Sequence, residues 1–187
     1  MKDNEDLEAI WERVALSRQH KQIFDGARDL HSELTQWSTK HNDMVAAAIR
    51  VSILMAKLSQ LVWCEIGTKK DLIACSKAVA NASEEVTEIA LQLAAFCPDL
   101  KIRKSQQAFH NFEKILAATS LRRSLQSQLN FGAPIFNRNE VEEAMQQLVF
   151  NAENLMKCVK NTVKVAETAS LKIQTDTGLK LKWIPKS

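Results

Sequence analysis

The chain has 187 residues, of which 45% are hydrophobic, four are glycine and three are proline, and its formal net charge is +3. Residues that form turns are too scarce for a fold of many short strands, so the composition predicts a single all-α domain. The net charge is too small to indicate nucleic-acid binding by itself, and no stretch approaches the roughly 20 apolar residues that a membrane span needs.

The first segment, residues 1–22, is predicted to be an acidic amphipathic helix or a strap. Five acidic residues and one lysine lie among residues 1–12, unlike a signal peptide, so a cytosolic protein is expected. Asp25 and Gly26 are expected to break the helix, and the domain boundary is placed between residues 22 and 23. One side of this helix carries its apolar residues, which are Leu7, Ile10, Trp11 and Val14.

Three further helices are expected in chain order. Apolar spacing of three and four predicts helices over 23–38 and 44–63, the second capped by Asn42 or Asp43. The third follows a break at Gly67 and Thr68 and ends near residue 96, because Pro98 disfavours helix in the residue before it. Its predicted buried stripe consists of Leu72, Cys75, Val79, Ala82, Val86, Ile89, Leu93 and Phe96.

The last two predicted helices cover 101–129 and about 139–175, separated by a loop at 130–134. The final one spans roughly 50 Å, so it needs neighbours of similar length. The elements together predict an elongated antiparallel up-and-down bundle of five helices over 23–187, plus the extra N-terminal helix. Seven lysines lie between Lys157 and Lys186, so this end presents positive charge.

Catalytic and metal-binding patterns are not found in the sequence. It contains no GxGxxG, GxxxxGK or HExxH motif, and the carboxylates of residues 84, 85 and 88 are interpreted as a solvated face. An enzyme, a cofactor and a metal are therefore not expected. The cysteines are interpreted as buried free thiols, since none forms a CxxC pair. They are Cys64, Cys75, Cys97 and Cys158.

Three stretches resemble the tail domain of the vinculin family. They are LHSELTQWSTKHNDMVAAAIRVSILMAKLSQL at 30–61, GTKKDLIACSKAVANASEEVT from Gly67, and NAENLMKCVKNTVKVAETASLKIQTDTGLKLKW from Asn151. The actin-binding domain of α-catenins is the near alternative, but it has a different hinge at the positions of Trp37 and Gly67 and a longer C-terminal extension.

The resemblance implies an adaptor in the cytoplasm, on the cytoskeleton at adhesion sites of the inner plasma-membrane face. Its expected partners are filamentous actin, acidic phosphoinositides and an intramolecular head domain that binds in an autoinhibited state. In this family the actin surface lies on the last two long helices. The residues carried over for actin are Leu121, Arg122, Leu125 and Lys172, and the two leucines could equally belong to the bundle core.

The lipid site of the family joins the first interhelix turn to the C-terminal tail. Carried over to this chain, it consists of Lys40, Arg50, Lys182 and Lys186. Ile49 and Pro185 stand where the family has basic residues, so weaker lipid binding is expected. A membrane-surface module whose main ligand is phosphoinositide is a second alternative reading.

Five residues fall at family positions that meet the head domain, and they could equally be solvated charges at helix ends. They are Lys69, Lys70, Asp99, Lys101 and Arg103. The sequence ends at Ser187, before the aromatic extension of the family tail, and contains no tyrosine. Tyrosine phosphorylation and the filament bundling assigned to that extension are therefore not carried over.

Overall fold

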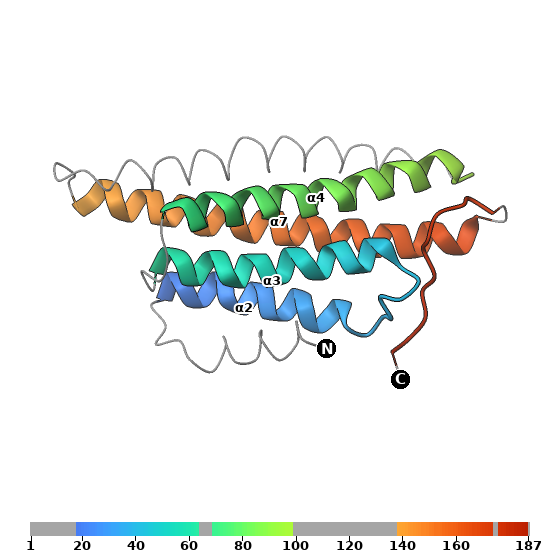
Figure 1. Cartoon of the computed structure of the whole chain (residues 1–187), viewed down its shortest axis with the longest axis horizontal. Helices are drawn as coiled ribbons and strands as arrows, with labels where there is room; N and C mark the ends of the chain where they lie inside the picture. The colour runs from blue at the N-terminus through green and yellow to red at the C-terminus, as the bar shows by residue number, and fades with distance from the viewer. Residues whose placement is uncertain (1–17, 64–68, 99–137, 174–175, 187) are drawn as a thin grey trace.

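The structure is a computed structural model that describes residues 18–63, 69–98, 138–173 and 176–186. These residues form four α-helices, namely α2 (Arg18–Leu34), α3 (Asp43–Trp63), α4 (Lys69–Phe96) and α7 (Arg138–Lys172). They lie side by side in an elongated bundle in which α3 runs opposite to the other three (Figure 1). The all-helical prediction is thus confirmed for the described residues, while the count of five bundle helices stays a prediction.

Helix α2 differs from its prediction at both ends. It runs without a break through Asp25 and Gly26 and ends at Leu34, so the predicted break and the predicted end at residue 38 are wrong. A Cβ atom at Gly26 would lie 2.9 Å from Cε of Met156, so this glycine permits the close approach of α2 to α7 rather than ending the helix. The domain boundary between residues 22 and 23 stays a prediction.

Helix α3 packs against all three other described helices, which are α2, α4 and α7. Its segment Asp43–Leu61 is long and apolar enough to cross a membrane by length and composition, with a mean hydropathy of 1.5, so the expectation that no such stretch exists is wrong. Packing accounts for this composition, since 61% of the segment is buried inside the bundle. Among its fully buried side chains are Met44, Val51, Met55 and Leu58.

The buried stripe predicted for α4 is largely confirmed, although Leu72 and Ile89 are only partly buried. Its last member is wrong, because Phe96 is 46% exposed. Cys97, four residues after the buried Leu93, takes the inward position instead and is fully buried. Thus the core-facing stripe passes beyond the helix into the residue that follows it.

Helix α7 begins at Arg138 and ends at Lys172, three residues before its predicted end. The spacing of four and three along this helix predicts one apolar seam that faces the other helices. Its described residues confirm the seam: Ile173, just after the helix, is partly buried, and six seam residues within the helix are buried, namely Ala152, Leu155, Val159, Thr162, Ala166 and Ala169. Three of these six are alanine. They allow neighbouring helices to approach closely along the length of α7.

Three of the four cysteines are buried free thiols, as predicted, and they are Cys75, Cys97 and Cys158. Cys64 lies outside the described residues. Burial raises the pKa of the Cys75 thiol to about 11, although the nearby charge of Lys57 acts in the opposite direction. This thiol therefore remains protonated and unreactive at neutral pH.

We expect Leu155→Ala to lower the free energy of unfolding by about 2–5 kcal/mol, because its side chain is 1% exposed and its loss leaves a cavity in the bundle. Leu171→Ala on the same helix is the matched control. That side chain is 83% exposed, so a change within about 0.5 kcal/mol is expected. Urea unfolding followed by circular dichroism measures both, and equal losses would contradict the packing described here.

Candidate functional site

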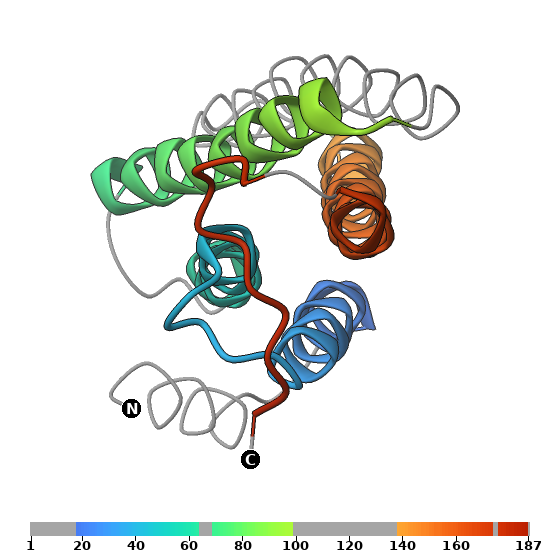
Figure 2. The same ribbon diagram turned by 90° about the vertical axis from the view of Figure 1, so that its right-hand side faces the viewer.

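The C-terminal arm, residues 176–186, lies across one end of the bundle against the turn between α2 and α3. Figures 1 and 2 show this segment crossing the end of the bundle toward that turn. Isolated antiparallel β-bridges pair Trp37 with Pro185 and Asn42 with Leu181. Two segments about 140 residues apart in the sequence are therefore held together as a short strand-like pair.

Main-chain hydrogen bonds carry most of the polar contact between the arm and the turn. Because they involve peptide groups, they leave the side chains of the arm available for other contacts. The four bonds run from Ser38 N to Ile184 O (2.7 Å), Lys186 N to Gln36 O (2.7 Å), Lys182 N to His41 O (2.7 Å), and Asp43 N to Lys180 O (2.9 Å).

Two tryptophans anchor the arm. The rings of Trp37 and Trp183 meet edge to face, with centroids 5.5 Å apart and an interplanar angle of 82°. The indole N–H of Trp183 also donates to the hydroxyl of Ser170 on α7, at 2.9 Å. Trp183 thus connects the end of α2 with the end of α7.

The arm starts in a tight turn after α7. Gly178 has a φ of 69°, which favours glycine because it has no Cβ atom. The N–H of Gly178 donates to Oδ1 of Asp176 at 3.0 Å, and the N–H of Leu179 donates to the hydroxyl of Thr177 at 3.2 Å. These side chains shape the turn, as Asp and Thr commonly do.

Side chains alternate along the arm. Leu179, Leu181 and Trp183 are partly buried against the core, whereas the intervening Lys180 and Lys182 are exposed. Two further exposed lysines, Lys40 in the turn and Lys186 in the arm, lie at the same end of the bundle. We call these four lysines the basic collar. The structure thus brings together three of the predicted lipid residues, Lys40, Lys182 and Lys186.

Lys180 belongs to the basic C-terminal end expected from the sequence, but it was not among the predicted lipid residues. Its Nζ lies 4.0 Å from Oδ1 of Asp43, the first residue of α3, and both side chains are about half exposed. Such an exposed and long pair contributes little stability. The signal that could have identified Lys180 is the strict alternation in Leu-Lys-Leu-Lys-Trp from Leu179, which is typical of an extended segment with one buried face.

Arg50 is placed differently from the other predicted lipid residues. It lies seven residues beyond Asp43, roughly 10 Å along α3. Its guanidinium donates a hydrogen bond to the carboxylate of Glu85 on α4. The structure therefore engages Arg50 in an ion pair between two helices rather than joining it to the arm.

The other predicted site residues are described only in part. Lys172 is exposed at the last residue of α7. Lys70 is exposed near the start of α4, at the opposite end of the bundle from the collar (Figure 1), and Lys69 begins that helix. The remaining predicted residues lie outside the described ranges, and they are Leu121, Arg122, Leu125, Asp99, Lys101 and Arg103.

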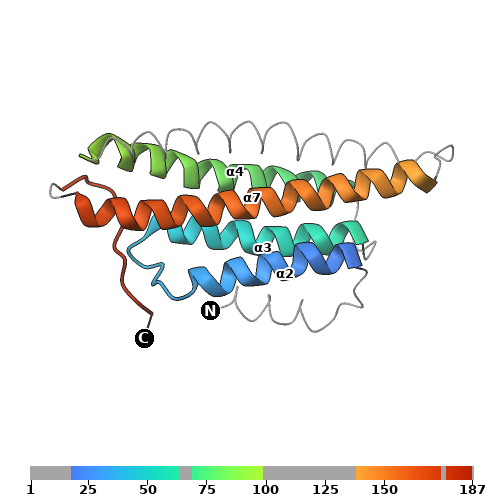
Figure 3. The same cartoon turned by 180° about the vertical axis from the view of Figure 1, so that it is seen from behind.

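A shallow groove next to the collar runs between α2 and α7, which are neighbours in Figure 2 and both lie in front of α3 in the rear view (Figure 3). The carboxylate of Glu33 on α2 pairs across it with Lys160 at 3.0 Å and with Lys164 at 3.2 Å. Partial burial raises the pKa of Glu33, but the hydrogen bonds and charges of these two lysines outweigh it and hold the pKa below its ordinary value of 4.5. The pairing therefore holds α2 against α7 at neutral pH.

In the described part of the chain, no three His, Cys, Asp or Glu side chains are grouped closely enough to hold a metal ion. The candidate site there consists of exposed lysines and half-buried tryptophans on an elongated helical bundle. Exposed positive charge of this kind attracts anionic groups.

The chain belongs to the vinculin family, whose family model matches residues 1–187. It is 46% identical to vinculin of Caenorhabditis elegans and 49% identical to vinculin of Brugia malayi, in each case over 97% of the chain. It is 42% identical to vinculin of Homo sapiens over 88% of the chain. The chain spans 18%, 19% and 15% of the lengths of these three relatives.

A solved structure of a vinculin homologue from a sponge matches the fold with a TM-score of 0.72 at 25% sequence identity. The match covers 97% of this chain and 23% of the sponge chain. The sponge protein is described as revealing vertebrate-like cell adhesions. The family and the helical fold of the chain are therefore established together.

The ion pairs of Glu33 predict a stability that depends on pH. A folded-state pKa below the ordinary value means that their contribution is present in full above that value and is lost as the pH falls through the folded pKa. We expect Glu33→Gln to lower the free energy of unfolding by less than about 1 kcal/mol at neutral pH, because the pairs are partly exposed. The difference from the unchanged protein should disappear on acidification.

Urea unfolding at several pH values from about 7 down to about 2 measures this difference, which should shrink as the pH falls through the folded pKa. Glu88→Gln, at an exposed position on α4, removes the same charge and serves as the control. If Glu33→Gln lowers the free energy of unfolding as much at the lowest pH as at neutral pH, the loss does not come from the ion pairs of Glu33.

Proposed function

We propose that this chain is the actin-filament-binding tail portion of a vinculin-family adhesion protein. The observation that carries the proposal is the family match over residues 1–187, together with the long α7 helix that ends at Lys172 beside the basic arm. The named relatives are vinculins, which favours a vinculin tail over the actin-binding domain of an α-catenin. No catalytic role forms part of the proposal.

Actin would be bound by apolar contacts and by positive charge. In this proposal the side chains of Leu121 and Leu125 are buried against actin. Their burial contributes a binding free energy of roughly 25 cal/mol per Å² of apolar surface removed from water. Arg122 and Lys172 face acidic groups of the filament. Charge of this kind speeds encounter more than it adds affinity, so binding should weaken as salt rises.

Co-sedimentation with actin filaments tests this proposal. We expect the folded chain to pellet with filaments at low salt and less at higher salt. Lys172→Ala should weaken binding by up to about fivefold, the size of an exposed charge contact. Lys77→Ala, at an exposed position on α4, is the control and should bind as the unchanged chain does. A folded chain that stays in the supernatant at tens of micromolar actin would falsify the actin assignment.

Acidic phosphoinositides are the second proposed ligand, bound by the basic collar. Lys40, Lys182 and Lys186 lie at one end of the bundle with exposed side chains. Two apolar side chains at the same end, Leu171 and Ile184, are 83% and 43% exposed and could enter the headgroup region. Each lysine near an anionic bilayer contributes about 1 kcal/mol, so the collar supports a measurable attraction without a deep pocket.

Liposome flotation with phosphoinositide-containing vesicles tests the collar. We expect the triple variant Lys40→Ala, Lys182→Ala, Lys186→Ala to lose about a hundredfold in affinity, which is about 3 kcal/mol in total. Removing three exposed lysines elsewhere, Lys57, Lys77 and Lys157, changes the net charge equally and is the matched control. Equal losses in both triple variants would leave only nonspecific charge attraction and would remove the collar as the site.

The third proposed contact is with the head domain of the same protein. Its candidate residues are Lys69, Lys70, Asp99, Lys101 and Arg103. This proposal rests on the family resemblance, and on the exposed position of Lys70 near the start of α4. Lys69 and Lys70 lie at the start of α4, at the end opposite the collar, whereas residues 99, 101 and 103 follow soon after that helix ends at Phe96. The proposal therefore does not assign the head domain to one end of the bundle. On the same resemblance, we propose that the protein acts at adhesion sites on the cytoplasmic side of the membrane.

A further inference from the structure

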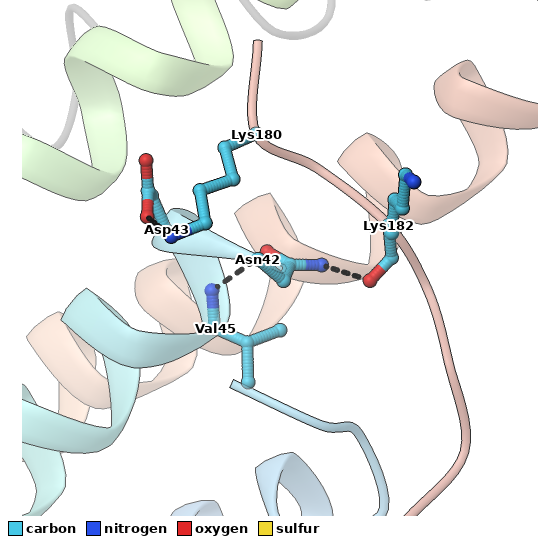
Figure 4. Close-up of polar contacts among 5 residues, drawn as sticks. All are labelled: Asn42, Asp43, Val45, Lys180 and Lys182. Carbon is cyan, nitrogen blue, oxygen red and sulfur yellow. Dashed lines mark hydrogen bonds and ion pairs between the residues drawn. The ribbon is translucent and has the colours of Figure 1, made fainter. Parts of the chain in front are cut away.

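Asn42 holds two structural elements at once. Its side chain is fully buried at the junction of the α2–α3 turn with α3. Its Oδ1 accepts from the N–H of Val45 at 3.0 Å, which caps the first turn of α3. Its Nδ2 donates to the main-chain carbonyl of Lys182 in the arm at 3.3 Å. Figure 4 shows the amide between these two partners, with one end directed to each.

The two contacts depend on one another because they share one planar amide group. Rotation of the side chain that brings its oxygen to Val45 also brings its nitrogen to the arm. A buried amide is stable only when both ends have partners. If the arm leaves, the nitrogen loses its partner, and water that enters to replace it also reaches the cap.

We propose that Asn42 couples docking of the C-terminal arm to the start of α3, so that the arm and the first turn of α3 respond as one switch. The main chain reinforces this link, since the N–H of Asp43 donates to the carbonyl of Lys180 at 2.9 Å. Release of the arm from the turn therefore destabilises the first turn of α3. By thermodynamic reciprocity, anything that loosens this turn also favours release of the arm.

The switch does not rest on the proposed lipid binding. The arm is held by main-chain bonds, by the Asn42 amide and by the Trp37–Trp183 contact, whereas the collar lysines are exposed. A ligand of these lysines could therefore act on a docked arm without competing for the groups that hold it. The coupling is a property of the fold itself and can be tested with no ligand present.

Amide hydrogen exchange on the full chain tests the coupling, because both parts of the switch have their own N–H reporters. Arm docking is reported by the amides of Ser38, Asp43, Lys182 and Lys186, each of which donates across the pair. The cap is reported by the amide of Val45. The amide of Leu58, in the core of α3, reports global unfolding, and it should exchange more slowly than the other reporters in every variant if these open locally.

The first variants cut the link at Asn42. Asn42→Asp and Asn42→Ser keep an oxygen that can accept from Val45, and both residues are favourable helix caps. Ionised Asp has no donor, and the hydroxyl of Ser sits one bond closer to the main chain than the Asn nitrogen, so it is too short to replace the bond to the carbonyl of Lys182. We expect the docking amides to exchange about fivefold faster, the effect of one lost hydrogen bond. Asn161→Ser, at an exposed position on α7, is the control and should alter neither set. Unchanged docking amides in both Asn42 variants would overturn the proposal.

The second variant loosens the arm far from the cap. Trp183→Phe keeps an aromatic ring against Trp37 but removes the indole N–H that donates to Ser170. We expect faster exchange at the docking amides and also at Val45, although residue 183 makes neither of the contacts of the Asn42 amide. In the double variant with Asn42→Ser, Val45 should no longer respond to Trp183→Phe. If Trp183→Phe speeds the docking amides and leaves Val45 unchanged, the two elements are independent and the coupling is wrong.

Discussion

The burial of α3 is the constraint on which the rest of the described structure depends. Its segment Asp43–Leu61 has the length and hydropathy of a membrane-crossing helix. Outside a bilayer, such a helix is stable only if protein covers most of its circumference. Contacts with α2, α4 and α7 provide that cover, and because each neighbour runs alongside α3, the bundle is elongated rather than round (Figure 1).

The end of the bundle follows from the same constraint. The first amides of α3 and several main-chain groups of the turn before it have no hydrogen-bond partners within their own segment. Asn42 supplies a partner for the amide of Val45, and the C-terminal arm supplies partners for main-chain groups of residues 36–43. Because peptide groups do this work, the lysines of the arm remain exposed. The main-chain bonds that hold the arm thus leave a positively charged surface exposed.

The binding residues proposed for this vinculin-family chain come from several parts of it. The collar lies at one end of the bundle and Lys70 near the start of α4 at the other (Figure 1). The proposed actin residues Leu121, Arg122 and Leu125 lie outside the described residues, so the actin proposal rests on the family and on α7. The contacts of Asn42 with the arm and with Val45 lie at the collar end of the bundle.

Much of the fold could be predicted because helical periodicity is a local property. Spacing of three and four identified α3, α4 and α7 and most of their buried residues, since a seam of this period faces one direction whatever its partners are. The charge of the collar lysines can likewise be predicted from the sequence. So can the alternation of lysine with apolar residues in the Leu-Lys-Leu-Lys-Trp stretch. The capping role of Asn42 was among the predicted alternatives.

Tertiary structure decided what depends on partners distant in the chain. Gly26 was predicted to break a helix, but the position of Met156 makes it a point of close approach within α2. Arg50 was grouped with the collar, but Glu85 on α4 engages it in an ion pair. The second contact of Asn42 joins residues 140 positions apart. The sequence by itself determined the helices and their apolar faces through local periodicity, whereas packing alone determined which of their side chains meet, because no local pattern encodes a partner so far along the chain.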